Sequence, residues 1–460
     1  MAGASRVVEN ATCTFCGCVC DDIDLTVEGR RITQAKNACV LGRAWFFEHR
    51  ADEDRPEALI RGVPATASEG IEAAARILAT ARYPVVYGLS DTTVEAQRVA
   101  VEIADITGAC LDTTTSVCHG PSGIAFQAVG EPTCTLGEIK NRADLVIFWG
   151  GNPAESHPRH FSKYSVTPKG MFVPNGKKDR YVVLVDVRRT PSARAANLFL
   201  QVKPRKDFEL LWTLRALVKG VTVDAGIEEE TGIPLATLQA LVERMKRAKF
   251  GVFLFGMGLS MTRGKLYNAA AILALASDLN RYTRFVAKPM RGHGNVTGAD
   301  NVVAWSTGYP FGVSFGRGYP RFNPGEYTTV DILARGEADA ALIVSADPAA
   351  NFPQPAIEHL KRIPTIVLDP KLSETAKIAT VAFTPAVYGI NVAGTVYRMD
   401  DVPIRLRAAL PSRYPSDEEI LRGIVKRIRD LQAVSSRSAP LPVGPLAEEE
   451  GGRPAHAQDQ

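Results

Sequence analysis

The sequence has 460 residues, of which 45% are hydrophobic and 23% are charged, and its formal net charge is +4. This length predicts two or three domains, and the composition is typical of a globular protein. The small net charge argues against nucleic-acid binding, which usually requires a concentrated basic surface. No apolar run reaches the roughly 18 to 20 residues that span a membrane, and the N-terminus lacks the apolar stretch of a signal peptide. We therefore expect a cytoplasmic protein.

Cysteines are concentrated at the N-terminus, where five of the eight lie within the first 39 residues. Cytoplasmic thiols stay reduced, so this clustering favours a metal centre over structural disulfides. Cys13, Cys16, Cys20 and Cys39 provide four thiolates, the ligand set of a 4Fe–4S cluster. The alternative is a four-cysteine zinc site, which usually contains two Cys-x2-Cys pairs where this sequence has one. We expect Cys18, which lies inside the loop, not to be a ligand.

Most of the remaining sequence alternates between helical patterns and short apolar strands. Helices are predicted at 69–81, 93–107, 207–218, 235–247 and 266–279. Strands are predicted at 23–27, 84–89, 145–149, 181–185, 252–255, 341–344 and 365–368. Nearly continuous apolar strands are typical of parallel sheets covered by helices on both faces, so the pattern predicts a doubly wound α/β fold. Residues 291–324, rich in glycine, proline and aromatics, predict a long ordered loop, and residues 436–460 predict a disordered tail.

Two loops carry candidate catalytic residues. Cys118 and His119 lie in a segment rich in Thr, Ser and Gly, where a soft thiolate ligand would stand beside an acid/base imidazole. A buried cysteine near a helix cap explains the same residues without chemistry. Arg291 lies in a glycine-rich loop with His293 and Asn295. Arg291 could stabilise a carboxylate-like substrate or transition state, and the alternative is a turn with solvated polar groups.

Polar residues follow several predicted strands, where α/β folds bind ligands. After the strand at 145–149 come Asn152, His157 and Arg159, and the last two could hold anionic groups such as phosphate. Asp186 ends the next strand, a usual position for a carboxylate that binds a ribose hydroxyl. In the second half the same scheme recurs with residues Asp347, Asn351 and Asp369. The repetition predicts two paired nucleotide-binding units.

These motifs together resemble those of the molybdopterin oxidoreductases. More specifically, the stretch from Cys13 to Ile23, the Cys118-His119-Gly120 triplet, the segment from Asn152 to His160 and the Arg291 loop are similar to the B subunit of formylmethanofuran dehydrogenase. The resemblance runs from about residue 10 to residue 410 and also covers the homologous B subunit of bacterial formyltransferase/hydrolase complexes. It implies an iron–sulfur domain at 1–54 and two Rossmann-like domains, one formed by 55–135 and 299–435 and the other by 136–298.

The resemblance also implies the cofactors and the role of each residue. A bis-molybdopterin guanine dinucleotide would hold tungsten or molybdenum, with Cys118 as metal ligand and His119 and Arg291 beside the metal. Residues expected at one nucleotide are Asn152, His157, Arg159, Asp186 and Asp207. Residues expected at the other are Asp347, Asn351 and Asp369. The 4Fe–4S cluster would carry electrons to or from this centre, where carbon dioxide and formate are interconverted.

Partner subunits are implied as well. In the family an amidohydrolase subunit joins formate to methanofuran, and we expect this subunit, a β-helical subunit and an electron carrier protein beside the chain. The sequence ends without the barrel domain that completes pterin binding in many relatives, so a barrel subunit would provide it. Leu41 stands where related oxidoreductases often carry a lysine between cluster and pterin. An alternative role is that of a cofactor-free structural subunit beside a formyltransferase subunit, and a further one is a zinc-stabilised nucleotide-binding module.

Overall fold

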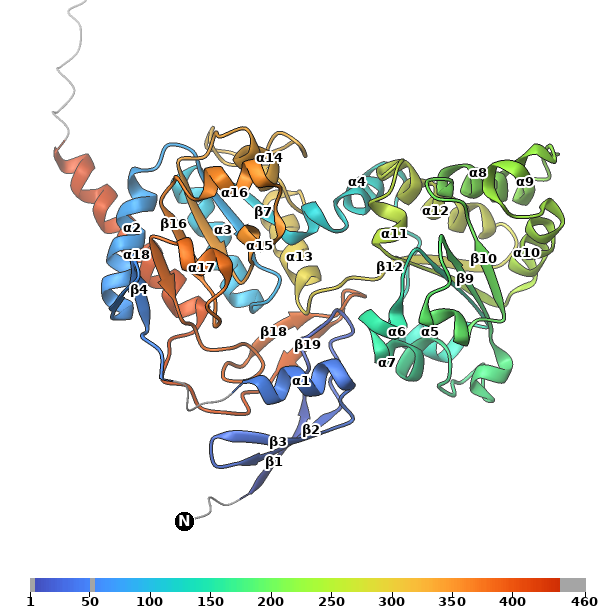
Figure 1. Cartoon of the computed structure of the whole chain (residues 1–460), viewed down its shortest axis with the longest axis horizontal. Helices are drawn as coiled ribbons and strands as arrows, with labels where there is room; N and C mark the ends of the chain where they lie inside the picture. Colours follow the sequence, from blue (N-terminus) through green and yellow to red (C-terminus); the bar gives the residue numbers. More distant parts are fainter. Residues whose placement is uncertain (1–4, 50–53, 439–460) are drawn as a thin grey trace, which may run out of the picture.

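The computed structural model describes residues 5–49 and 54–438 and contains two α/β lobes with a small antiparallel sheet beside them (Figure 1). The prediction of a disordered tail concerns residues 436–460. Residues 436–438 continue the last helix, and the others lie outside the described residues. Within the described residues, no helix combines the length and apolar character needed to cross a membrane.

The small sheet is formed by the N-terminal strands. β1 (Arg6–Ala11), β2 (Ile23–Glu28) and β3 (Arg31–Lys36) pair antiparallel in that order and lead into α1 (Val40–Glu48). The loop between β1 and β2 carries four cysteines, and Cys39 caps the start of α1. The sequence predicted only the second strand, because β1 and β3 contain few apolar side chains and no continuous apolar run.

One lobe is built on a sheet of nine strands. Its centre is parallel and contains β7 (Cys110–Thr113), β6 (Pro84–Gly88), β15 (Ala340–Val344), β16 (Thr365–Leu368) and β17 (Val381–Phe383), in that order. Antiparallel strands close its two edges: β14 (Arg321–Phe322) and β13 (Val313–Ser314) on one side, β4 (Ala58–Ile60) and β5 (Val63–Ala65) on the other. This sheet therefore joins strands from before and after the strands of the other lobe.

The other lobe holds five parallel strands in the order β10 (Leu198–Gln201), β9 (Tyr181–Asp186), β8 (Leu145–Trp149), β11 (Phe250–Phe255) and β12 (Arg284–Pro289). One face packs against α4 (Gly120–Val129), α8 (Asp207–Val218), α10 (Leu235–Arg247) and α12 (Leu266–Leu279). The opposite face packs against α5 (Leu136–Arg142) and the N-terminal sheet with its cysteine loop. The cysteine loop is thereby fixed to this lobe by a shared apolar core.

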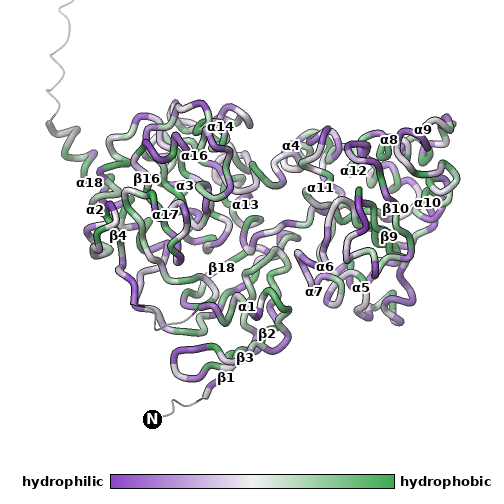
Figure 2. Tube along the Cα trace, in the orientation of Figure 1, coloured by the Kyte–Doolittle hydropathy of each residue, from purple (hydrophilic) through white to green (hydrophobic). Residues whose placement is uncertain are grey.

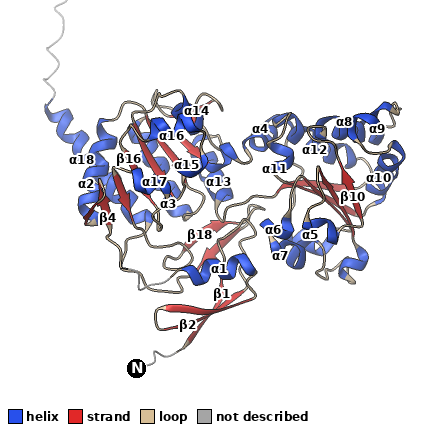
Figure 3. Ribbon diagram, in the orientation of Figure 1, coloured by secondary structure: helices blue, strands red, loops and turns tan. Residues whose placement is uncertain are grey.

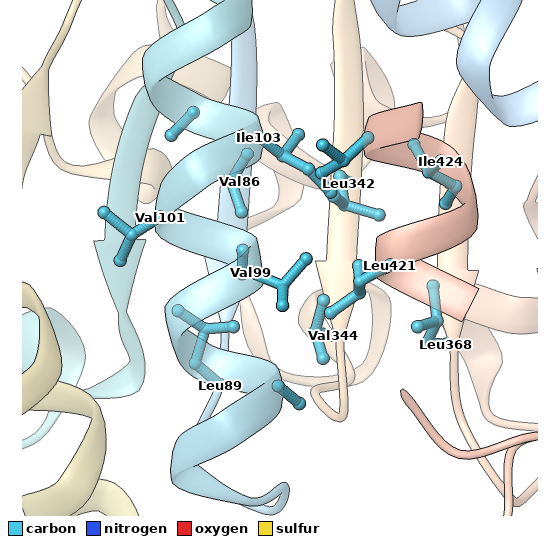
Figure 4. Close-up of a cluster of buried hydrophobic side chains, with 14 of the residues drawn as sticks. Val86, Leu89, Val99, Val101, Ile103, Leu342, Val344, Leu368, Leu421 and Ile424 are labelled. Carbon is cyan, nitrogen blue, oxygen red and sulfur yellow. The ribbon is translucent and has the colours of Figure 1, made fainter. Parts of the chain in front are cut away.

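Helices cover both faces of the nine-stranded sheet, as Figure 3 illustrates. On one face lie α2 (Ala67–Thr80), α3 (Val94–Thr107), α13 (Val296–Thr307) and α18 (Asp417–Ser438). On the other lie α14 (Thr329–Ala334), α16 (Gln354–Leu360) and α17 (Glu374–Ile378). Figure 4 shows Val99 and Ile103 of α3 and Leu421 and Ile424 of α18 packed over strand residues such as Leu342. Burial of these apolar surfaces is the main stabilising contribution.

Helix α2 shows how the local sequence defines an element. Thr66 caps its N-terminus and accepts from the backbone N–H of Glu69, whose carboxylate in turn accepts from the backbone of Thr66, forming a capping box. Apolar residues on one face are buried while the other face stays in solvent. The hydropathy colouring of Figure 2 follows the same division along the chain, with green segments at the strands inside each lobe.

The structure confirms a mixed α/β fold with several sheets. The prediction of one long loop over residues 291–324 was wrong, because this segment contains α13, β13 and β14. The smaller elements are α6 (Pro153–Ser156), α7 (Pro158–His160), α9 (Gly226–Thr231), α11 (Met257–Ser260), α15 (Pro348–Asn351) and the hairpin of β18 (Gly394–Tyr397) and β19 (Pro403–Leu406).

Candidate functional site

Five cysteines line one small pocket between the N-terminal strands and the five-stranded lobe. They are Cys13, Cys16, Cys18, Cys20 and Cys39, all free thiols. Phe15, Ile23, Ala38, Pro158 and Arg159 complete the lining. The structure thus brings together the four cysteines expected as ligands, although they lie in two separate segments. It also places Cys18 in the same pocket.

Two glycines allow the cysteine loop to pack closely. A Cβ atom at Gly42 would lie 2.9 Å from Sγ of Cys13 and 3.8 Å from Sγ of Cys39. A Cβ atom at Gly17 would lie 2.3 Å from the carbonyl oxygen of Arg291. The backbone N–H of Gly17 also donates to the carbonyl of Gly292 at 3.2 Å. The cysteine loop is therefore in direct contact with the loop that carries Arg291.

The chemistry of the pocket fits a thiolate-bound metal centre. Burial raises the pKa of Cys20 to about 12, although the charges of Lys163 and Arg159 lower it, and burial also raises the pKa of Cys13 well above its usual range. Within the described residues, no three His, Cys, Asp or Glu side chains converge closely enough to hold a single metal ion. A buried thiolate requires a compensating positive charge. Bound iron would supply that charge and so stabilise the thiolate form of these cysteines.

A much larger cavity, of about 1250 Å³, lies at the carboxyl ends of the strands of both sheets. From the nine-stranded lobe, Asp91, Cys118, Asp347 and Asp369 line it after β6, β7, β15 and β16. From the other lobe, Ser156 and His157 follow β8, Met257 and Met261 follow β11, and Gly292 and His293 follow β12. The carboxyl edge of a parallel sheet is where α/β folds bind ligands, and this cavity exceeds the roughly 300 to 1,000 Å³ of typical small-molecule sites.

Cys118 lines this cavity, whereas His119 and Arg291 are buried, with exposed fractions of 1% and 6%. Nη2 of Arg291 donates to Oγ1 of Thr115 and to Oδ2 of Asp300. Burial lowers the pKa of Arg291, but the Asp300 carboxylate outweighs this and the net shift is upward. Burial raises the pKa of Cys118 and the charge of Arg291 lowers it. A fixed cation therefore acts on the thiol that faces the cavity.

His119 is neutral near pH 7. Its Nδ1 hydrogen bonds with Oγ of Ser122 at 3.2 Å, and its Nε2 is buried without a hydrogen-bond partner. Burial, with a contribution from Arg291, lowers the pKa of His119 to about 3. A hydrogen bond with the backbone of Met290 opposes this shift but does not reverse it.

His157 links the cavity to the Arg291 loop. Its Nε2 donates to the carbonyl oxygen of Arg291 at 2.7 Å, and its Nδ1 accepts from Oγ of Ser156 at 2.8 Å. Burial lowers the pKa of His157, so the imidazole is neutral and holds the Arg291 backbone in place. It contributes no positive charge for a phosphate.

The loops after β8 and β15 have the same construction. Asn152 (φ −121°, ψ 71°) and Asp347 (φ −124°, ψ 70°) each precede a proline at the start of a four-residue helix. Oδ1 of Asn152 accepts from Oγ of Ser192 at 2.6 Å, and Oδ1 of Asp347 accepts from Oγ1 of Thr375 at 2.6 Å. These matching bonds support the duplication predicted from the sequence. In each side chain the bond engages the Oδ1 oxygen.

The other predicted nucleotide contacts divide into two groups. Asp347, Asn351 and Asp369 line the large cavity. The residues that do not line it are Asn152, Arg159, Asp186 and Asp207. Asp186 accepts from the backbone N–H of Arg188, and Asp207 is buried and accepts from Nε1 of Trp149 at 2.8 Å. Arg159 lies at the cysteine pocket instead.

Sequence reasoning missed Asp91 and Tyr388 on the cavity wall and named His293 only as part of the Arg291 loop. Asp91, His293 and Tyr388 form one hydrogen-bonded set: Nδ1 of His293 lies 3.2 Å from Oδ2 of Asp91, and the hydroxyl of Tyr388 donates to Oδ1 of Asp91 at 3.0 Å. Asp91 follows a predicted strand, the signal used for Asp186, and could have been found that way. Asp300, which binds Arg291, lies in the segment predicted as a loop and gave no signal.

Comparison with known proteins decides the family. No family model matches the chain. The B subunit of the tungsten-containing formylmethanofuran dehydrogenase 2 of Methanocaldococcus jannaschii is 44% identical over 93% of this chain and 99% of its own length. The chain belongs to the family of formylmethanofuran dehydrogenase B subunits. The corresponding protein of Methanococcus maripaludis is 43% identical, covering 93% of this chain and 100% of that protein.

More distant relatives of this family extend the comparison. The B subunit of the formyltransferase/hydrolase complex of Methylorubrum extorquens is 29% identical over 81% of this chain and 97% of its length. The crystal structure of that complex with methylofuran matches with a TM-score of 0.67 at 26% identity, over 82% of this chain and 99% of the matched chain. Acetylene hydratase from Pelobacter acetylenicus matches with a TM-score of 0.68 at 10% identity, over 91% of this chain and 69% of that chain, which indicates a shared fold. The resemblance found in the sequence is thus confirmed, and the family's members are subunits of multisubunit complexes.

Proposed function

We propose that this chain is the catalytic subunit of a formylmethanofuran dehydrogenase, which interconverts carbon dioxide and formate or formylmethanofuran. Its proposed cofactors are a 4Fe–4S cluster held by Cys13, Cys16, Cys20 and Cys39, and a bis-molybdopterin guanine dinucleotide with tungsten or molybdenum bound through Cys118. Such a centre supplies two-electron chemistry at carbon. The single observation that carries the proposal is that Phe15 and Cys16 line both the cysteine pocket and the large cavity, so an electron would have a short route between the two sites.

The chain's own residues suit the reaction. Arg291, fixed by Asp300, provides a buried cation that favours a bound carboxylate such as formate. His119 is neutral and buried next to Cys118 in the chain, so it adds no charge beside that thiol. Formation of formate from carbon dioxide consumes two electrons and a proton, and His293 and Asp91 on the cavity wall are titratable groups able to hold a proton there.

The nucleotide contacts in this proposal come from both lobes. Asp347, Asn351 and Asp369 would bind one guanine nucleotide, as their position on the cavity wall supports. His157 and Asn152 would bind the second through backbone and side-chain atoms of the same loop, with Asp186 and Asp207 at the guanosine end. Partner subunits, including an amidohydrolase subunit, would complete the activity, in keeping with the complexes of the relatives.

The proposal is tested by metal analysis of the complex purified without oxygen. We expect tungsten or molybdenum together with about four irons per chain from the cluster. Cys118→Ala should abolish viologen-linked formate oxidation and leave the iron content unchanged, because Cys118 lies outside the cysteine pocket. Cys110→Ala is the matched control, since Cys110 is buried on the strand preceding Cys118 and lines neither site. Retained activity in Cys118→Ala would remove Cys118 from the proposed ligand set.

A second candidate function is that of a cofactor-free structural subunit in a formyltransferase/hydrolase complex. The observation that favours it is that this structure matches 99% of the length of a chain in the Methylorubrum complex. The higher identity to the tungsten-containing enzymes, 44% against 29%, favours the redox function. A complex that hydrolyses formylmethanofuran and holds neither tungsten nor molybdenum would establish the structural role instead.

A further inference from the structure

Two carboxylates and two cations form a compact ion-pair network beside the cysteine pocket. Nη1 and Nη2 of Arg159 donate to the two carboxylate oxygens of Asp22 at 2.6 and 2.7 Å, a bidentate pair. Nζ of Lys163 donates to Asp21 at 2.8 Å and to Asp22 at 2.9 Å. The two Asp residues end the cysteine loop, and the two cations follow β8 of the five-stranded lobe. The network therefore joins the cysteine loop to that lobe.

The cations face inward and the carboxylates face solvent. The side chains of Arg159 and Lys163 have exposed fractions of 18% and 17%, against 41% and 42% for Asp22 and Asp21. Arg159 is also a lining residue of the cysteine pocket. Both cations bind carboxylates of the two residues that directly follow Cys20 in the chain. Water screens the negative charges better than the positive ones, so the network presents a net positive potential to the cysteines.

The position of Arg159 differs from that expected of a nucleotide contact. It does not line the large cavity, and four of its neighbours in the cysteine pocket are Cys13, Cys16, Cys20 and Cys39. Asp22 occupies the two guanidinium nitrogens best placed for bidentate binding of a phosphate. The geometry places this cation where an iron–sulfur cluster, rather than a nucleotide, would feel its charge.

We propose that Arg159 and Lys163 are positioning residues that raise the reduction potential of the cluster. This inference rests on the proposed function, which supplies the cluster. One-electron reduction adds one negative charge to a site that already carries four thiolates. A fixed cation in a partly buried position stabilises the reduced form more than the oxidised form. Hydrogen bonds and charges around the sulfur ligands are the usual determinants of such potentials.

The experiment is an EPR-monitored redox titration of the full-length chain with its cluster reconstituted without oxygen, with dithionite as reductant. Arg159→Gln and Lys163→Gln should each lower the midpoint potential of the cluster by about 59 mV. For one electron, this shift is a tenfold decrease in the ratio of reduced to oxidised cluster at the wild-type midpoint. Arg159→Lys keeps the charge and should keep most of the potential. Asp22→Asn removes a negative charge and should shift the potential in the opposite direction.

Arg215→Gln is the matched control. Arg215 pairs with Asp278 at 2.8 Å in the same lobe, with similar side-chain exposure of 14%, but it lies on α8, outside the cysteine pocket. Its variant should titrate like the wild type. If the role of Arg159 were purely structural, its variants would change the iron content, but the midpoint potential would not follow the charge of the side chain at this position.

Three results would overturn the inference, and a fourth would contradict the proposed function. Unchanged potentials in Arg159→Gln and Lys163→Gln at full iron content overturn the inference. So does a loss of bound guanine nucleotide in the Arg159→Gln complex at an unchanged potential, which would make Arg159 a nucleotide contact. If Arg159→Gln loses iron, Arg159→Lys must restore both iron and potential, and failure to do so also overturns the inference. A wild-type chain that binds no iron contradicts the proposed function itself.

Discussion

The buried pair of Arg291 and Asp300 offers the most direct test of how the candidate active site is held together. Asp300 accepts from Oγ1 of Thr113 at 2.9 Å and from Oγ1 of Thr115 at 2.8 Å, besides its ion pair with Arg291. The side chains of Arg291 and Asp300 have exposed fractions of only 8% and 12%. Asp300→Asn preserves the size of the side chain but leaves the guanidinium as an uncompensated buried charge.

Removal of one partner from such a pair costs about 3 to 5 kcal/mol of the free energy of unfolding. The assay is urea unfolding of the full-length chain, followed by circular dichroism. Glu418→Gln is the control, because Glu418 and Arg422 form an exposed helical pair worth about 0.3 to 0.5 kcal/mol. In the background of Arg291→Met, Asp300→Asn should cost much less, since no buried cation remains to be compensated.

Two results would refute this reasoning. The first is a loss in Asp300→Asn no larger than that in Glu418→Gln. The second is an equal loss with and without Arg291, which would mean that Asp300 stabilises the protein through Thr113 and Thr115 alone. In either case Arg291 would not be fixed by this carboxylate, and its orientation beside Cys118 would need another explanation.

Two further predictions concern packing and pH. Gly42→Ala should reduce the iron content of the reconstituted chain, because the added Cβ would lie 2.9 Å from Sγ of Cys13. Gly137→Ala is the control and should retain the iron, because its Cβ would meet only Oγ1 of Thr135, at 3.6 Å. Equal iron in both variants would contradict this prediction. Burial raises the pKa of Asp207 to about 6, above about 3.9 in the unfolded chain, so the native protein binds the extra proton and its stability falls as pH rises from about 4 to about 6. Asp207→Asn keeps the acceptor for Nε1 of Trp149 and should remove this loss. Thermal unfolding should therefore show the wild type losing stability relative to the variant between about pH 4 and about pH 6. A constant difference between the two proteins over that interval would show that Asp207 does not titrate in this way.

Long periodic elements were predictable from the sequence. The strand at Leu145–Trp149 and the helices at Asp207–Val218, Leu235–Arg247 and Leu266–Leu279 have the bounds that the pattern predicted. Continuous apolar runs and helical periodicity are local signals, and tertiary packing reinforces them here. Strand β12 was missed because it contains Lys288, which is buried at 1% exposure with its Nζ donating to the carbonyl of Met399.

Helix α13 was missed for a related reason. Its sequence contains Gly298, Asp300 and Asn301, which weaken helix propensity. In the structure Asp300 is paired with Arg291, and the apolar side of α13 packs into the core of the nine-stranded lobe. Tertiary contacts therefore override the local preference, and nothing in a short window of sequence reports them.

The sequence by itself determined the cysteine set, the α/β class, the duplicated strand–loop pattern and the family, because each depends on residue type and spacing along the chain. The tertiary structure decided which of these residues share a site. Arg159 follows the β8 strand like a phosphate ligand, yet it pairs with Asp22, 137 residues earlier in the chain, at the cysteine pocket. Such a pairing depends on how the N-terminal sheet packs against the five-stranded lobe. Long-range packing has no local periodicity, so only the folded chain reveals it.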